Sequence, residues 1–341
     1  MRLGVLTSGG DCSGLNAAIR AVARQTAARG GELIGFEDAW RGVLERAWVP
    51  VTVEYCRGLL PRGGTVLGTS RITPYQEEGD LDLARAVRDE LDLDGFVVIG
   101  GNGSLACAAR LTTDGIPCIG IPKTIDNDIG LTEHSIGFDT AVHVAAAAID
   151  RLHTTAEAHD RVLVVEVMGR HAGHVAVRAG LAGGATLTLV PERPFVLDDV
   201  IAAIERRHRA GRYATVVAVA EGALPAAGTW EIPEPEIDRF GHARLGGVGA
   251  ALGAEIERRT GYETRVTVLG YVQRGGTPTA FDRVLATRLG LAAVDAAYDG
   301  AWGSMMALQA DRIVRVSLAE ATEAQATVPE ELLDAAAAFF P

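Results

Sequence analysis

Residues 122–128, which read Pro-Lys-Thr-Ile-Asp-Asn-Asp, carry the most specific chemistry in this sequence. Asp126 and Asp128 flank an amide. Residues at i and i+2 of an extended turn point to the same side, so both carboxylates can face one cavity. Transfer of a phosphoryl group to an alcohol needs a base near the attacking hydroxyl and a carboxylate that holds a metal ion. The turn can supply one aspartate for each task; the alternative is an Asx-turn with solvated acids.

Two short glycine-rich loops follow predicted strands. They are residues 7–14, with Ser8-Gly9-Gly10-Asp11, and residues 100–104, Gly-Gly-Asn-Gly-Ser. Small residues there let backbone N–H groups approach an anion, and a following helix adds its positive N-terminal end. Neither loop matches the Walker A pattern or the dinucleotide fingerprint. They predict phosphate binding of another kind, unless the glycines only permit tight turns.

Five arginines lie at or beside strand ends or glycine turns: Arg71, Arg161, Arg170, Arg265 and Arg274. A guanidinium binds a phosphate through a bidentate fork. A single arginine is more often a solvated surface residue. Arg71 and Arg274 are the better candidates, because small neighbours allow a ligand to approach them closely.

Short apolar runs alternate with Ala-rich amphipathic stretches, which is typical of βα units and a buried parallel sheet. The predicted strands are 3–7, 96–99, 118–121, 162–167, 187–190, 215–220 and 267–269. The predicted helices are 15–28, 81–90, 141–154, 197–210, 249–260 and 281–298. Polar or glycine-rich turns follow nearly every strand. In open α/β sheets ligands bind at the carboxyl ends of strands, so these turns predict one large site.

The composition is that of an ordinary globular protein: 341 residues, 48% hydrophobic, 22% charged, net charge −12. An acidic chain is a poor candidate for non-specific nucleic-acid binding. The four cysteines form no CxxC pair, which predicts free thiols in a reducing compartment. We see no signal peptide and no apolar run of the ~18 residues that a membrane span needs, so we expect a cytoplasmic protein.

Together these segments resemble the phosphofructokinase A family from Leu3 to about Gly290. The resemblance rests on five motifs in order: Thr7-Ser8-Gly9-Gly10-Asp11, residues 63–71, residues 122–128, Glu166-Val167-Met168-Gly169-Arg170 and residues 269–276. It implies an α/β fold of two similar Rossmann-like three-layer lobes with mainly parallel sheets and the active site in the cleft between them. Residues 1–137 plus about 251–299 would form the phosphoryl-donor lobe. Residues 138–250 plus about 300–320 would form the sugar-phosphate lobe, and 321–341 a C-terminal tail.

The resemblance also implies a reaction, the phosphorylation of fructose 6-phosphate at its 1-hydroxyl, with Mg²⁺ as cofactor. Asp126 is expected to be the general base, and Thr124 to touch the transferred phosphoryl group. Asp128 would order the metal site. Arg71 and Arg170 would stabilise charge on the transferred phosphate.

The other implied contacts fall into two groups. Donor binding is expected from Gly9, Gly10, Asp11, Arg71, Gly101, Asn102, Gly103, Ser104 and Lys123. Substrate binding is expected from Thr124, Asp126, Arg161, Met168, Gly169, Arg170, Glu221, Arg265, Tyr271 and Arg274. Of these, Arg161, Arg265, Tyr271 and Arg274 would surround the 6-phosphate. In the family Arg161 and Arg265 come from a neighbouring subunit, which predicts a dimer or tetramer with shared sites.

The sequence departs from the family at a few positions. Asn102 stands where the family usually has an acid associated with magnesium, so we expect a weakened metal site made with Asp128. Tyr271 stands where it often has histidine. Gly103 resembles the ATP-using members, where a side chain would crowd the α-phosphate, whereas Lys123 resembles the pyrophosphate-using members.

We expect ATP as the donor. One alternative is pyrophosphate, and another is a specialised paralogue acting on a different sugar or cyclitol phosphate. A third is a weakly catalytic sugar-phosphate-binding protein. Asp126, Asp128 and Arg170 argue against the third, because a binding module has no use for a base.

Overall fold

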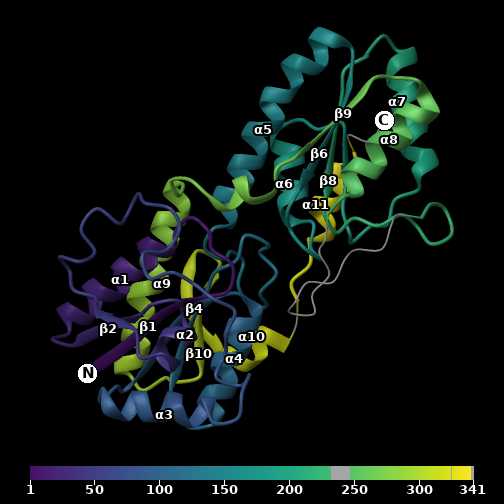
Figure 1. The fold of residues 1–341 in the computed structure, drawn as a ribbon. Helices are drawn as coiled ribbons and strands as arrows, with labels where there is room; N and C mark the ends of the chain where they lie inside the picture. Colours follow the sequence, from purple (N-terminus) through teal and green to yellow (C-terminus); the bar gives the residue numbers. More distant parts are fainter. Residues whose placement is uncertain (232–245, 324, 339–341) are drawn as a thin grey trace. The chain divides into compact units, whose positions relative to one another are not determined.

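The computed structural model describes residues 1–231, 246–323 and 325–338. The chain divides into two units (Figure 1). The first comprises Met1–Thr140 and Arg274–Ala326, and the second Ala141–Gln273 and Thr327–Pro341. The chain therefore passes from one unit to the other three times, and each unit contains segments that are distant in sequence.

A seven-stranded sheet forms the centre of the first unit. Its strands are β1 (Arg2–Ser8), β2 (Glu32–Phe36), β3 (Trp48–Pro50), β4 (Gly95–Gly100), β5 (Cys118–Pro122), β10 (Ser304–Gln309) and β11 (Arg312–Ser317). Their order is β11-β10-β5-β4-β1-β2-β3. The inner strands are parallel, and only the edge strands β3 and β11 pair antiparallel with their neighbours.

Helices cover both faces of this sheet (Figure 1). They are α1 (Leu15–Ala28), α2 (Trp40–Leu44), α3 (Asp80–Glu90), α4 (Asn102–Thr113), α9 (Ala280–Tyr298), α10 (Leu318–Glu323) and the start of α5 (Phe138–His159). The helices α1 and α9 pack against each other on one face, and α2, α3, α4 and α10 share a core with the sheet on the other. Every residue of β4 and β5 is buried, because both faces are covered.

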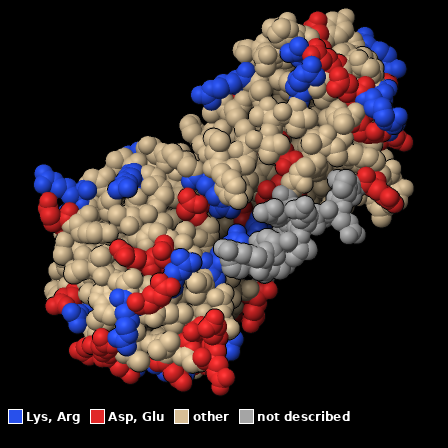
Figure 2. All heavy atoms as spheres, viewed as in Figure 1, with Lys and Arg blue, Asp and Glu red and all other residues tan. Residues whose placement is uncertain are grey.

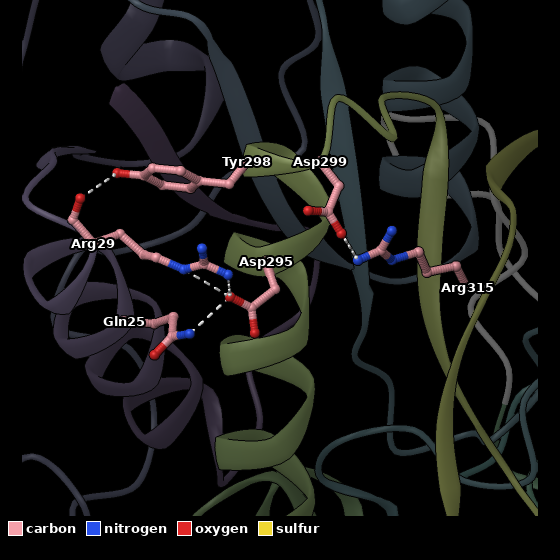
Figure 3. A network of polar contacts seen from close by, with 6 residues as sticks. All are labelled: Gln25, Arg29, Asp295, Tyr298, Asp299 and Arg315. Atoms are coloured by element: carbon pink, nitrogen blue, oxygen red, sulfur yellow. Dashed lines mark hydrogen bonds and ion pairs between the residues drawn. The ribbon is translucent and has the colours of Figure 1, made fainter.

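Small residues bring α1 and α9 close together. A Cβ at Gly290 of α9 would lie 2.7 Å from the Cβ of Ala21 and 3.0 Å from the main-chain oxygen of Ala18. At the end of the same contact, Asp295 accepts hydrogen bonds from Gln25 and Arg29 (Figure 3). Exposed ion pairs of this kind stabilise a fold by roughly 0–1 kcal/mol. This polar network therefore adds little to the stability of the contact.

The second unit contains a four-stranded parallel sheet in the order β7-β8-β6-β9. Its strands are β6 (Val162–Val167), β7 (Leu187–Leu189), β8 (Thr215–Ala220) and β9 (Thr264–Val268). Its helices are most of α5, α6 (His174–Ala182), α7 (Leu197–Arg209), α8 (Val248–Thr260), α11 (Glu330–Ala337) and the 3₁₀ helix η1 (Gly270–Arg274). The helix α6 packs on β7 and β8, with α11 against α6. The helix α8 packs on β6 and β9 with α7 beside it.

The α/β class with mainly parallel sheets is confirmed, but the predicted domain limits need correction. Residues 304–317 were assigned to the sugar-phosphate lobe, yet β10 pairs with β5 and β11 pairs with β10 in the first unit. Residues 251–273 were assigned to the donor lobe, yet β9 pairs with β6 in the second. The predicted tail, residues 321–341, contains the end of α10 and all of α11, and α11 packs on α6 and β7. Positions 324 and 339–341 of that tail lie outside the described residues.

Acidic and basic side chains are interspersed on the visible face of each unit (Figure 2), as is typical of a surface that faces water. Within the described ranges, no helix is long and apolar enough to cross a membrane.

Candidate functional site

Three loops gather at the carboxyl ends of adjacent strands in the first unit. Residues 9–14 follow β1, residues 101–104 follow β4 and residues 123–128 follow β5. The chain leaves β1 toward β2 and leaves β4 toward β5, so the strand order reverses between β1 and β4. Open α/β sheets bind ligands at such a reversal. The fold therefore places both glycine loops at the expected edge.

Hydrogen bonds join these loops to the segment that carries Arg71. Gly9, with a φ of +86°, is in a conformation that favours glycine. Its N–H donates to the main-chain oxygen of Ser70 at 2.9 Å. The Ser104 hydroxyl donates to Oγ of Ser8 at 3.0 Å. These two hydrogen bonds connect the first glycine loop to the residue before Arg71 and to the second glycine loop.

Lys123 is the only lysine of the chain, and it is 3% exposed. Its Nζ donates to the main-chain oxygen of Ser8 at 3.1 Å and also to that of Gly10. Burial lowers the pKa of this ammonium group. Because an ammonium group has three N–H donors, two of them brace the first glycine loop and one is left for a ligand oxygen.

Cys12 also lies in the first loop, but it is fully buried, and burial raises the pKa of its thiol to about 12. A protonated, buried thiol is a poor nucleophile. Cys12 is therefore not expected to act as a nucleophile in this loop.

The carboxylate turn is braced by an amide and a hydroxyl. Asn127 has a φ of +54°; its Oδ1 accepts from the N–H of Ser135 at 2.9 Å and its Nδ2 donates to the main-chain oxygen of Glu133 at 3.0 Å. The Ser135 hydroxyl donates to the main-chain oxygen of Thr124 at 2.6 Å. The N–H of Asp126 donates to Oγ1 of Thr124 at 3.1 Å. The turn is therefore a fixed structure rather than a solvated Asx-turn.

Asp126 and Asp128 are 5% and 8% exposed. The Nδ2 of Asn102 lies 3.5 Å from the main-chain oxygen of Asp128, so the two residues predicted for the metal site are neighbours. Gln325 donates to Oδ2 of Asp128 at 3.4 Å. These residues tie the carboxylate turn to the start of α4.

The donor set at this place suits Mg²⁺, the ion that the resemblance implies. In the part of the chain that the structure describes, no three His, Cys, Asp or Glu residues form a group that could hold a metal ion. Mg²⁺ does not need such a cage, since it usually keeps several waters and takes one or two carboxylates together with substrate phosphates. A buried carboxylate beside an amide is compatible with that mode of binding.

Arg274 lies against the first glycine loop. Its Nη1 donates to the main-chain oxygen of Asp11 at 3.0 Å. A Cβ at Gly10 would lie 2.7 Å from that Nη1 of Arg274. The sequence grouped Arg274 with Arg265 and Tyr271 around a 6-phosphate. The structure assigns Arg274 to the first unit and the other two to the second.

In the second unit, residues 168–173 follow β6 and residues 221–222 follow the adjacent strand β8. Oε1 of Glu221 accepts from the N–H of Arg170 at 3.0 Å and from that of Gly169 at 3.3 Å. A Cβ at Gly222 would lie 1.9 Å from the main-chain oxygen of Arg170, whose φ is +54°. Glu221, predicted to hold the sugar, therefore also binds the backbone that carries Arg170.

Arg161 and Arg265 converge on one carboxylate. Glu263 pairs with Arg161 at 2.7 Å and with Arg265 at 2.5 Å, and the hydrogen bond from Arg161 lowers the pKa of that carboxyl. Arg265 lies on β9, an edge strand of its sheet. Tyr271, predicted to lie near the same phosphate, is 83% exposed. Arg161 and Arg265 therefore form an ion-pair cluster with Glu263.

The predicted residues are divided between the two units. The first unit holds Gly9, Gly10, Asp11, Arg71, Gly101, Asn102, Gly103, Ser104, Lys123, Thr124, Asp126, Asp128 and Arg274. The second holds Arg161, Met168, Gly169, Arg170, Glu221, Arg265 and Tyr271.

Sequence reasoning did not find the residues that fix the loops. Asn127 was interpreted only as the amide between two acids, and Ser135 was not singled out. One signal was available for Asn127, because asparagine tolerates the left-handed conformation that it adopts here. No pattern in the sequence indicates that Ser135 reaches back to Thr124.

Comparison with known proteins gives consistent results. Residues 2–297 match the Phosphofructokinase family. Over the full length of both chains, the sequence is 55% identical to the pyrophosphate–fructose 6-phosphate 1-phosphotransferase of Amycolatopsis methanolica. It is 51% identical to ATP-dependent 6-phosphofructokinase 3 of Streptomyces coelicolor, over 97% of each chain. The phosphofructokinase structure from Saccharomyces cerevisiae covers 94% of this chain, with a TM-score of 0.83 and 30% identity, and this chain covers 45% of it.

Proposed function

The chain belongs to the phosphofructokinase family and is therefore a phosphotransferase, and we propose that it transfers a phosphoryl group from ATP to the 1-hydroxyl of fructose 6-phosphate. The products are fructose 1,6-bisphosphate and ADP. The observation that carries this proposal is the braced, buried turn that holds Asp126 beside two glycine loops.

In this proposal Asp126 takes the proton of the 1-hydroxyl as its oxygen attacks the terminal phosphorus of the donor. The bond between that phosphorus and the bridging oxygen breaks, and the leaving phosphate keeps the electron pair. The base must be in place before the donor and acceptor meet. The hydrogen bonds of Thr124 and Ser135 support this role, because they fix the backbone on both sides of the turn.

Four cations are proposed to stabilise the charge of the transferred phosphate: Lys123, Arg71 and Arg274 from the first unit, and Arg170 from the second. Lys123 and Arg274 both donate to the backbone of the first glycine loop, which fixes their own positions. Electrostatic groups act best when they need no reorganisation at the moment of reaction. Mg²⁺ bound near Asp128 and Asn102 would supply further positive charge beside the donor phosphates.

We propose ATP as donor because of the space at Gly103, in the first turn of α4. A Cβ built there meets nothing within 4 Å. Space next to the helix N-terminus admits the α-phosphate and nucleoside that ATP has and pyrophosphate lacks. A glycine at this position leaves that space open.

Pyrophosphate is the second candidate, and Lys123 favours it. A buried ammonium with one remaining donor is well suited to a small, highly charged anion. The Amycolatopsis methanolica relative is named for pyrophosphate, and the Streptomyces coelicolor relative for ATP. Both donors therefore belong in the test.

The test measures fructose 1,6-bisphosphate formation from fructose 6-phosphate with either donor, in wild type and in Gly103→Asp. An aspartate in the first turn of a helix is compatible with folding, because it meets the positive end of the helix. We expect wild type to use ATP, and Gly103→Asp to lose ATP turnover while keeping its unfolding midpoint. Gly103→Ala, which adds only a methyl group where a Cβ meets nothing within 4 Å, is the control and should retain most of the ATP rate.

A wild type that uses only pyrophosphate overturns the donor proposal. A wild type that is inactive with both donors overturns the acceptor proposal as well. That last result favours a paralogue acting on another phosphorylated sugar or cyclitol.

We also propose a homo-oligomer with shared sites. Val266 and Val268 are exposed on the edge strand β9, next to Arg265, and an edge strand with apolar side chains is suited to cover by another chain. Mixing inactive Asp126→Asn with inactive Arg265→Ala tests this, because a hybrid oligomer regains some intact sites. Activity that does not return after the chains are unfolded and refolded together contradicts shared sites.

A further inference from the structure

The loop that carries Arg170 is anchored at both ends by carboxylates. Glu221 binds the N–H groups of Gly169 and Arg170 at its start. At its end, the N–H of Gly173 donates to both oxygens of Glu192, at 2.9 Å and 3.0 Å. The Glu192 carboxylate therefore binds the end of the loop directly.

The hydrogen bonds from Gly173 to Glu192 take the place of a side-chain cap on α6. Gly173 is the N-cap residue of α6 and has no side chain with which to cap it. A carboxylate at a helix N-terminus accepts from the unpaired N–H groups and meets the positive end of the helix. A Cβ at Gly173 would lie 2.8 Å from Oε2 of Glu192 and 2.6 Å from the Cβ of Val190. Only glycine lets the loop approach Glu192 this closely.

The same carboxylate also binds the C-terminal segment. The N–H of Val328 donates to Oε1 of Glu192 at 3.2 Å. Val328 is 3% exposed and Leu333 of α11 is 4% exposed, so these two side chains are buried, and α11 packs on α6 and β7. One side chain therefore connects residues 168–173 to a segment more than 150 positions further along the chain.

Ion pairs next to Glu192 hold α11 in place. Arg193 pairs with Asp334 at 2.6 Å and also with Glu330, both on α11. Glu192 binds the backbone in front of α11, and Arg193 binds its exposed side. Glu192 and Arg193 therefore both bind the C-terminal segment.

We propose that Glu192 is a positioning residue through which the C-terminal segment, residues 327–338, sets the conformation of the Arg170 loop and hence the affinity for the phosphorylated acceptor. The role in acceptor affinity rests on the function proposed above. The mechanical link between the segment and the loop does not, because it consists of contacts within the second unit.

The link is tested by amide hydrogen exchange of residues 168–174 without substrate. Glu192→Ala removes the carboxylate that accepts from the N–H of Gly173. The double variant Glu330→Gln/Asp334→Asn removes both ion-pair partners of Arg193. We expect faster exchange in this loop in both variants. Glu331→Gln, at an exposed acid on α11 that forms no ion pair with the described residues, is the matched control and should leave exchange unchanged. Unchanged exchange in both test variants overturns the link, whatever the enzyme's substrate.

The functional consequence is tested by steady-state kinetics of the full-length chain. Loss of a helix cap typically shifts the equilibrium between the capped and the opened conformation by about 2- to 30-fold. We expect the KM for fructose 6-phosphate to rise by that factor in Glu192→Ala, with the KM for the donor unchanged. Glu192→Asp, which keeps the carboxylate, should recover part of the affinity. Equal changes in both KM values, or no recovery in Glu192→Asp, contradict a positioning role at the acceptor.

Discussion

The buried carboxylate of Asp282 accepts two hydrogen bonds from Thr140, one from the N–H at 2.9 Å and one from the hydroxyl at 2.5 Å. Its other oxygen accepts from the N–H of Gly137 at 2.9 Å. Thr140 is in the first turn of α5 and Asp282 in the first turn of α9. Gly137 is also packed on Cys12, so this network reaches the first glycine loop.

We expect Asp282→Asn to lower the free energy of unfolding more than the same substitution at an exposed acid on α9. The amide has one acceptor in place of two, and a buried donor left without an acceptor costs about 1–3 kcal/mol. Urea denaturation measures the difference. Asp295→Asn, in the exposed network of Figure 3, is the control and should cost roughly 0–1 kcal/mol. Equal losses of unfolding free energy in the two variants would show that the buried Asp282 network stabilises the fold no more than an exposed ion pair does.

The same residue predicts a pH dependence of stability. Burial raises the pKa of Asp282 above its usual value of 3.8. The folded state then binds more protons than the unfolded state between the two pKa values, so stability from this group is present at low pH and is lost as pH rises through the folded pKa. The stability difference between wild type and Asp282→Asn should therefore shrink as pH rises from 3.8. A difference that grows over this range contradicts the raised pKa.

Asp126→Asn should nearly abolish turnover while sugar-phosphate binding persists. Loss of a general base typically costs about 10²–10⁴-fold in rate. Steady-state rates and calorimetric titration with fructose 6-phosphate measure the two properties separately. A variant that keeps more than about half of the wild-type rate is not missing its base.

The central strands and most helices were predictable because each is a continuous run with its own period. The strand 162–167 matches β6, and the helix 15–28 matches α1. By contrast, β10 has its partner β5 far away in sequence, beyond a second unit, so no local pattern assigns it to the first sheet. The sequence prediction assigned α11 to a C-terminal tail, whereas its contacts with Arg193, α6 and β7, all distant in sequence, place it in the second unit.

The candidate site shows the same limit. Asp126, Lys123 and Gly9 lie in short motifs, so the sequence singled them out. Glu192 and Ser135 act through backbone groups of distant residues, and such contacts leave no motif. The side-chain chemistry of the site was therefore predictable from the sequence, whereas the bracing that fixes it required the structure.

Lys123 should titrate below the ordinary lysine pKa of 10.5, because burial disfavours its charged form. Since it is the only lysine, carbon-13 labelling at the ε position gives a single lysine resonance. Its chemical shift against pH yields the pKa directly. The KM for the donor should begin to rise at the same pH, because a neutral amine no longer attracts phosphate. A resonance that titrates at 10.5 or above rules out this environment for Lys123.

Asn102 lies at the start of α4, and its Nδ2 is 3.5 Å from the main-chain oxygen of Asp128. A carboxylate at this position would bring a second negative charge to the place where Asp128 is proposed to bind Mg²⁺. An amide offers only a neutral oxygen and two donors, and Mg²⁺ prefers charged oxygens.

Asn102→Asp should therefore lower the Mg²⁺ concentration needed for half-maximal rate and raise the rate with ATP. An aspartate is also favourable at a helix N-terminus, so the substitution should not weaken the fold. The rate is measured against Mg²⁺ concentration with ATP and, separately, with pyrophosphate. Asn102→Ser, which has no charge, is the control and should not lower the Mg²⁺ requirement.

The added charge should act in the opposite direction on a small, highly charged donor. Pyrophosphate gains less from a tighter metal ion if a carboxylate faces its oxygens, since like charges repel. The ratio of ATP rate to pyrophosphate rate should therefore rise in Asn102→Asp. A variant that is slower with both donors and needs no less Mg²⁺ shows that Asn102 has another task, and that result favours a paralogue with a different acceptor.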